Sequence, residues 1–126
     1  MALKISHDPN APTAAIELMI TRRLTDYDLE EVEAAVPREV DPILASQGFK
    51  DLLDEARAIL DAALAGSGLE IAQLTGAICA DGGVYRPGIW LVLREANAGA
   101  SRAMSSQTSA RVAAVAEELR THLGLS

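Results

Sequence analysis

The stretch FKDLLDEARAILDAAL, from Phe49 to Leu64, mixes apolar and charged residues with the period of an α-helix. Its apolar residues recur at spacings of three and four, and charged residues occupy the remaining positions. This pattern predicts an amphipathic helix with one face on a core. Asp41 and Pro42 predict the start of a short helix upstream, and the glycines of AGSG (65–68) predict the end of the long helix.

The next segment has a different pattern. LEIAQLTGAIC is followed by CADGGVYRPGIW and the apolar run IWLVL, which is rich in strand-forming residues. The Gly-Gly and Pro-Gly pairs supply turn residues between two potential strands. We therefore expect an antiparallel hairpin at about 70–95 and an α+β domain, with three to five helices packed on a small antiparallel sheet.

Three further segments are expected to contribute helices. Residues 28–36 show apolar residues inward and glutamates outward before Pro37, and residues 112–123 show a helical stripe behind the Ser/Thr-rich SSQTS (105–109). Residues 14–24 fit either a helix stripe or strand alternation, and their Ala, Glu, Leu and Met favour the helix. A single domain over 1–126 is predicted, with an extended segment at about 1–12 and a mobile loop at about 97–109.

Composition limits the class of protein. The 126 residues suit one domain, and a chain with 49% hydrophobic but only 3% aromatic residues must build its core from Ala, Leu, Ile and Val. The longest apolar run is far shorter than a membrane span, and no targeting segment is visible at the start. With a single cysteine, the expected location is a cytoplasm, with no membrane partner.

The net charge of −7 lies in the first half of the chain. Residues 1–69 carry 13 acids and 6 bases, whereas residues 70–126 carry 5 of each. The acids concentrate between Asp26 and Asp61, while residues 96–116 contain Arg102 and Arg111 and no acid. This excess of acidic residues disfavours nonspecific binding to nucleic acid. It suits a solvated surface and contacts between unlike surfaces.

Few residues could carry chemistry. His7 and His122 lie at opposite ends of the chain and Cys79 is alone, so no metal or cofactor site is predicted. Asp81 follows Cys79 by two residues, but a carboxylate raises the pKa of a thiol and makes a poor activator. We therefore expect Cys79 to be a small buried strand residue and the protein not to be an enzyme.

Two binding functions remain as alternatives. LEIAQLTG (69–76) resembles the second helix of a winged helix-turn-helix domain, and Ser67 and Glu70 match a capping box. The resemblance implies a mostly α fold in which residues 49–64 and IWLVLREANAG (89–99) are the first and recognition helices of a DNA-binding regulator. That recognition helix would present only Arg94 to DNA. The other alternative is an anion or small-molecule site at GASRAMSSQTSAR, where hydroxyls precede a helix.

The hypothesis that these observations favour is a non-catalytic, acidic assembly or protein-interaction module. We expect a homo-oligomer or a protein partner, for example in a ring or connector component of a phage-like particle. The candidate contact residues are Asp81, Tyr85 and Arg86 at the hairpin tip, where Tyr and Arg are favoured interface residues. Arg102 and Arg111 complete the set.

Overall fold

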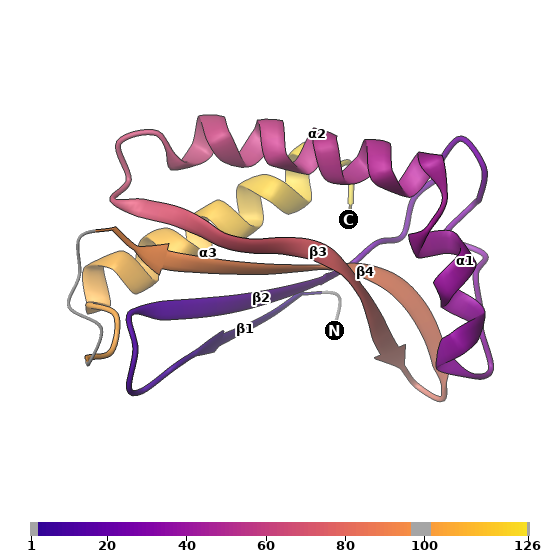
Figure 1. The fold of residues 1–126 in the computed structure, drawn as a ribbon, viewed down its shortest axis with the longest axis horizontal. Helices are drawn as coiled ribbons and strands as arrows, with labels where there is room; N and C mark the ends of the chain where they lie inside the picture. Colours follow the sequence, from indigo (N-terminus) through magenta and orange to yellow (C-terminus); the bar gives the residue numbers. More distant parts are fainter. Residues whose placement is uncertain (1–2, 97–101, 126) are drawn as a thin grey trace.

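The structure is a computed structural model that describes residues 3–96 and 102–125. Two strands come first, followed by helices, a long strand pair and a last helix (Figure 1). The elements are β1 (Leu3–His7), β2 (Thr13–Met19), the 3-10 helix η1 (Pro37–Val40), α1 (Asp41–Leu44), α2 (Gln47–Leu64), β3 (Leu69–Asp81), β4 (Val84–Glu95) and α3 (Ser106–His122). This arrangement confirms the α+β class.

The four strands form one antiparallel sheet in the order β1-β2-β4-β3. β2 and β4 are therefore central, and β1 and β3 are the edge strands. Ile16 of β2 pairs with Ile5 on one side and with Leu91 on the other. Because side chains alternate between the faces of a strand, Ile16, Leu18, Leu91 and Leu93 all point to one face, and all four are fully buried.

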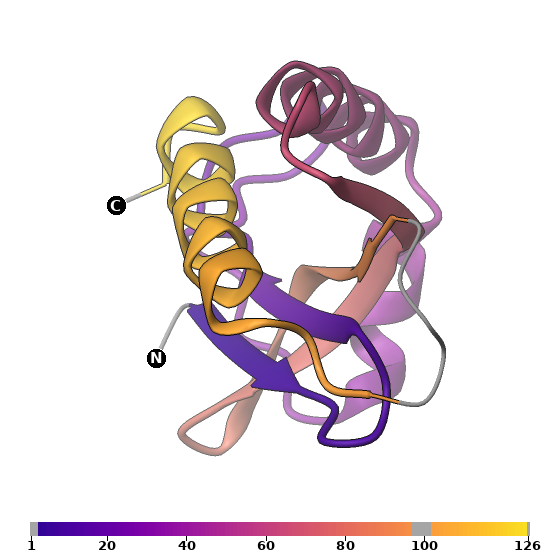
Figure 2. The ribbon, with the colours of Figure 1, turned by 90° about the vertical axis from the view of Figure 1, so that its left-hand side faces the viewer.

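The two long helices cover that buried face. α2 lies over β3 and α3 over β2, and the helices also contact each other (Figure 2). Phe49 is the chain's only phenylalanine and is fully buried among aliphatic residues of both helices and the sheet. The core is thus aliphatic, as composition predicted. Its α-helical part includes Leu52, Ala56 and Leu60 of α2 and Val112, Val115, Ala116 and Leu119 of α3.

The ends of the long helices follow their capping residues. The Ser46 hydroxyl accepts a hydrogen bond from the Phe49 amide (3.2 Å), and the Ser105 hydroxyl accepts one from the Thr108 amide (3.2 Å). Gly66 follows α2 with a φ of 72° and Gly124 follows α3 with a φ of 76°, a left-handed region that favours glycine. The helix predicted at 49–64 is confirmed, and so is the C-terminal helix expected around 112–123, which begins earlier than expected, at Ser106. The upstream helix begins at Asp41, where an N-cap was expected.

The helix favoured for residues 14–24 is wrong, because residues 13–19 form the central strand β2. Helix-forming residues are overruled here by pairing with a neighbour on each side and by alternate burial along the strand.

The helix predicted at 28–36 is also wrong, because the segment contains only turns and isolated bridges. The Asp28 carboxylate accepts a hydrogen bond from the Glu30 amide (3.2 Å), which favours a turn. Ala34 then pairs with Tyr85 at the start of β4. This pairing extends the chain where a helix was expected.

The predicted hairpin forms from β3 and β4, which pair from Leu69 and Glu95 to Asp81 and Val84. A register shift between Ile71 and Gln73 leaves Ala72 in a β-bulge. The mostly α winged helix-turn-helix alternative is therefore wrong, because both of its proposed helices in this region contain strand residues instead.

The segments predicted as extended (1–12) and as a mobile loop (97–109) both contain regular secondary structure. The extended segment at 1–12 contains β1, and the loop predicted at 97–109 overlaps α3 from Ser106 onwards. Residues 97–101 of that loop lie outside the described residues. None of the helices described is both long and apolar enough to cross a membrane.

Candidate interaction surface

Cys79 lies on β3, on the sheet face turned away from α2 and α3. It is buried, and the pKa of the thiol is raised to about 12, mainly by that burial and also by hydrogen bonding to Glu17 and by the negative charge of Glu17. Such a thiol is protonated at neutral pH and is a poor nucleophile. The structure confirms the prediction that Cys79 is a small buried strand residue.

His7 and His122 lie on different elements, apart from each other and from the Cys79 thiol. His7 ends β1, and His122 ends α3 with its Nδ1 atom 2.8 Å from the carbonyl oxygen of Glu118. Across residues 3–96 and 102–125, no group of three or more His, Cys, Asp or Glu side chains is placed to hold a metal ion.

Asp81 and Arg86 meet at the base of the hairpin turn, but Arg86 is not free to contact a partner. Its Nε atom donates to the Asp81 carboxylate (3.1 Å), and its guanidinium lies 3.4 Å from the carbonyl oxygens of both Leu29 and Glu30. Only 13% of its side chain is exposed. Arg86 therefore ties the loop before Ala34 to the hairpin, while Tyr85 beside it is half-buried.

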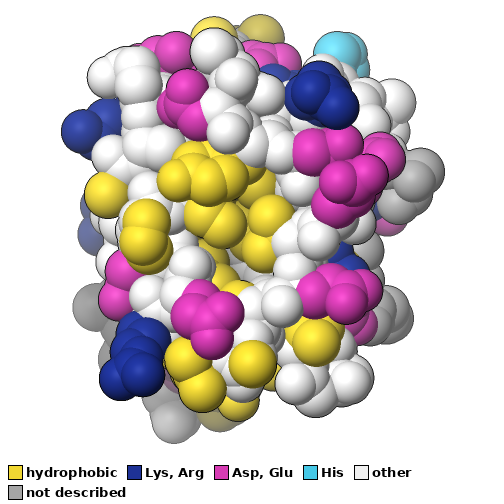
Figure 3. All heavy atoms as spheres, turned by 90° about the vertical axis from the view of Figure 1, so that its right-hand side faces the viewer, with side chains coloured by type: hydrophobic (Ala, Val, Ile, Leu, Met, Phe, Trp, Pro, Cys, Tyr) yellow, Lys and Arg dark blue, Asp and Glu magenta, His cyan; other side chains and the backbone are white. Residues whose placement is uncertain are grey.

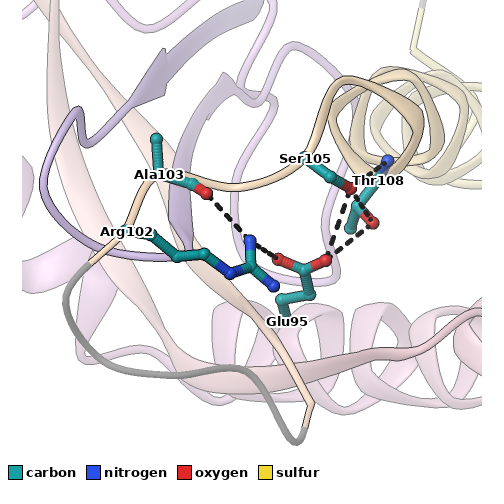
Figure 4. Close-up of polar contacts among 5 residues, drawn as sticks. All are labelled: Glu95, Arg102, Ala103, Ser105 and Thr108. Carbon is teal, nitrogen blue, oxygen red and sulfur yellow. Dashed lines mark hydrogen bonds and ion pairs between the residues drawn. The ribbon is translucent and has the colours of Figure 1, made fainter.

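Arg102 belongs to a polar cluster at the start of α3 (Figure 4). Its guanidinium donates to the Glu95 carboxylate (3.3 Å) and to the carbonyl oxygen of Ala103 (3.0 Å). The same carboxylate accepts hydrogen bonds from the hydroxyls of Thr108 (3.1 Å) and Ser105 (3.4 Å). Glu95 of β4 is thus the anion that sits at the N-terminus of α3.

The charge state of Glu95 follows from these contacts. Desolvation raises the pKa of its carboxyl group, but the hydrogen bond from Thr108, the charge of Arg102 and the hydrogen bonds from Ser105 together outweigh it and leave the pKa lowered. The carboxylate is therefore ionised at neutral pH. An external phosphate at this helix terminus would meet a negative charge, so the structure offers no support for the anion-binding alternative.

Arg111 is on the first half of α3 and donates to the carbonyl oxygen of Ser67 (2.8 Å), in the turn that joins α2 to β3. Arg102 contacts Glu95, the last residue of β4, and Arg111 contacts Ser67 just before β3, so both lie at the end of the hairpin opposite to the β3–β4 turn. The five predicted contact residues thus form two separate groups. Asp81, Tyr85 and Arg86 lie at one end, and Arg102 and Arg111 lie at the other.

Hydrophobic side chains gather at the end that carries α1 and the β3–β4 turn, with acidic side chains around them (Figure 3). In the part of the chain described, Val36 and Ile78 are the large apolar residues with more than a third of their surface exposed, each at 37%. Leu44 of α1 is half-buried and reaches over Gly76, two residues before Ile78. We call Val36, Leu44 and Ile78 the apolar end face.

Acidic residues in the chain segments of this end carry the surrounding charge. Glu31 and Glu33 precede Val36, Glu39 is in η1 and Asp41 begins α1, and all four are exposed. These residues belong to the acidic stretch that the sequence identified.

Sequence reasoning missed the apolar end face because it assigned Val36 to the inner side of a helix. A signal was present in the element lengths. The 13 residues of β3 span about 40 Å, whereas the 18 residues of α2 span about 27 Å. Phe49, in the first turn of α2, lies over Gly76, so the strand continues past the helix. Apolar residues beyond that point have less cover.

A hollow with a volume of about 400 Å³ lies between α2 and α3. Its floor is apolar, and its polar side chains are Glu118 and His122 of α3. The lining from α2 consists of Ala58, Ile59, Ala62 and Ala63, which places this side of α2 towards α3.

No protein-family model, no curated protein and no solved structure matches the chain.

Proposed function

We propose that the protein is a non-catalytic assembly or protein-interaction module that associates with further copies of itself. A ring or connector component of a phage-like particle is one example of such a protein. The observation that carries the proposal is the apolar end face. Val36 and Ile78 are exposed, and the hydrophobic side chains at this end of the molecule have acidic side chains around them (Figure 3). Exposed apolar groups with polar borders are typical of protein–protein contacts.

The contacts of the other candidate residues support the same proposal. The thiol is buried and protonated, Glu95 is held by its own neighbours, and Arg86 and Arg111 bond to backbone carbonyls. These groups contribute to the stability of the fold, and their geometry favours no reaction. Arg94 pairs with Glu70 across β3 and β4, so the structure lends no support to its proposed role in reading DNA.

Light scattering coupled to size-exclusion chromatography tests the proposal over a range of protein concentrations. We expect a mass above 13.3 kDa that increases with concentration. The double variant Val36→Thr/Ile78→Thr keeps β-branched side chains but makes both positions polar, and it should shift the distribution to smaller species. Ala114→Ser, on the exposed side of α3, is the control and should leave the distribution unchanged.

A chain that stays monomeric at millimolar concentration would contradict self-association. Association that the double variant leaves unchanged would show that the apolar end face is not the contact surface.

A further inference from the structure

We propose that a second copy of this chain docks antiparallel along the outer flank of α2, with a row of four charged residues meeting the same row of the partner copy. The charge row consists of Lys50, Asp54, Arg57 and Asp61. This proposal rests on the proposed self-association and adds to it a second contact surface, distinct from the apolar end face, with two-fold symmetry.

The four residues form a line on the helix. Their spacings of four, three and four residues keep them on one stripe nearly parallel to the helix axis. All four are exposed. Since Ala58, Ile59, Ala62 and Ala63 face α3 and Phe49, Leu52 and Leu60 face the core, helix geometry places the charge row on the flank away from α3. That flank overlies the edge strand β3.

The row alternates in sign, but its members form no ion pair with one another or with other residues in 3–96 and 102–125. Other exposed charges of α2 have partners, because Glu55 binds Arg22 (2.7 Å) and Asp51 accepts from Gln47 (2.9 Å). A Lys that precedes an Asp by four residues is the less favourable order for a pair within a helix.

The order of charges is complementary to itself when reversed. In an antiparallel helix pair related by a two-fold axis between residues 55 and 56, Lys50 faces the partner's Asp61, and Asp54 faces the partner's Arg57. The symmetry repeats both contacts, so every member of the row meets an opposite charge. A parallel pairing in register would place like charges together. The complementarity therefore selects a second copy in the antiparallel orientation.

The strand below the helix permits this approach. β3 is an edge strand, and between Glu70 and Asp81 it carries no charged residue. Glu70 and Asp81 are themselves neutralised by Arg94 (2.7 Å) and Arg86 (3.1 Å). Phe49 lies over Gly76, and α2 runs antiparallel to β3. The two-fold axis, which passes through the middle of the charge row, therefore crosses β3 about three residues before Gly76, near Gln73. The bulge at Ala72 lies beside it, and a bulge disfavours a continuous ladder with another strand. The helices thus form the main contact.

Charge reversal provides the test. In the acidic variant, Lys50→Glu/Arg57→Glu, the row carries four acids. In the basic variant, Asp54→Lys/Asp61→Lys, it carries four bases. We expect the homodimer dissociation constant to rise about tenfold or more in each variant, because attractive pairs become repulsive ones. An equimolar mixture should form a heterodimer, which native mass spectrometry distinguishes by mass.

A control variant with the same net charge as the acidic variant, Lys4→Glu/Arg23→Glu, changes exposed residues outside α2 and should dimerise like the unmodified chain. Circular dichroism should show the same helix content for all variants. Heterodimer formation in the mixture supports the proposal. If neither charge reversal weakens self-association, the charge row is not the contact, but the proposed function stands. The same conclusion follows if the mixture of the acidic and basic variants fails to associate. An unmodified chain that remains monomeric at millimolar concentration overturns both.

Discussion

Gly88 is the residue whose substitution should disturb the sheet most sharply. It lies on β4, between Met19 of β2 and Ala77 of β3. A Cβ atom added at Gly88 would lie 2.3 Å from the Cys79 Sγ atom and 2.8 Å from the carbonyl oxygen of Leu18. Both distances are below the 3.0 Å that Cβ atoms respect in proteins. The sulfur can rotate away, but the carbonyl oxygen belongs to the central strand and moves only with the backbone.

We expect Gly88→Ala to lower the free energy of unfolding by about 3 kcal/mol, at the upper end of the usual cost of overpacking, because a backbone atom must move. For a chain of this length, that loss corresponds to a fall in Tm of about 12 °C. Urea denaturation monitored by circular dichroism measures the change. Gly76→Ala is the matched control on the neighbouring strand. Its Cβ would meet only side-chain atoms of Phe49 and Leu44, at 3.0 and 3.1 Å, and should cost about 1 kcal/mol or less.

The double variant Gly88→Ala/Cys79→Ala separates the two clashes. It removes the contact with sulfur and keeps the contact with the Leu18 carbonyl, so it should be more stable than the sum of the two single effects by about 1 kcal/mol. A cost for Gly88→Ala below about 1 kcal/mol, together with additive single effects, would refute the close approach at this position.

Two further predictions concern ionisable groups. Cys79 should resist alkylation at pH 8 in the native protein and react after unfolding in urea, because its pKa is raised to about 12; rapid labelling of the native chain, followed by mass spectrometry, would contradict this. Glu95 has a lowered pKa in the folded state, so its carboxylate stabilises the fold above the ordinary glutamate range, and this contribution is lost as the pH falls through the lowered value. Glu95→Gln should therefore be less stable than the unmodified chain at pH 7 and differ from it less near pH 3. Urea titrations at both pH values measure this, and an equal difference at the two would oppose the ionised role.

The sequence was informative where a pattern extended over several turns of helix. Residues 49–64 keep one apolar face through more than four turns, and the hairpin strands are separated by residues suited to a turn. Residues 14–24 fitted two periods, and their helix-forming composition pointed the wrong way. What decides the structure there is pairing with β4, whose residues are distant in the sequence.

The contact surfaces could not be predicted from the sequence in the same way, because they depend on the relative lengths of strands and helices and on which segments lie side by side in the fold. Arg86 was predicted at an exposed tip because its place in the hairpin was visible, but the carbonyls of Leu29 and Glu30 that bury it belong to a segment predicted as helix. The apolar end face is likewise left exposed because β3 is longer than α2 and extends beyond its N-terminal end. The charges of the α2 row could be read from the sequence, whereas their position above an edge strand required the fold.

The order of strands also bears on how the chain is made. β2 must pair with β4, and Ile16 and its partner Leu91 are 75 residues apart in the sequence. During synthesis from the N-terminus, the apolar side of β2 has no central partner until β4 leaves the ribosome, about 4–15 s later at ordinary elongation rates. The β1–β2 hairpin alone is too small to be stable in water. A chaperone or the nascent helix α2 would have to shield Ile16 and Leu18 over that interval, so aggregation during translation is a hazard built into this topology.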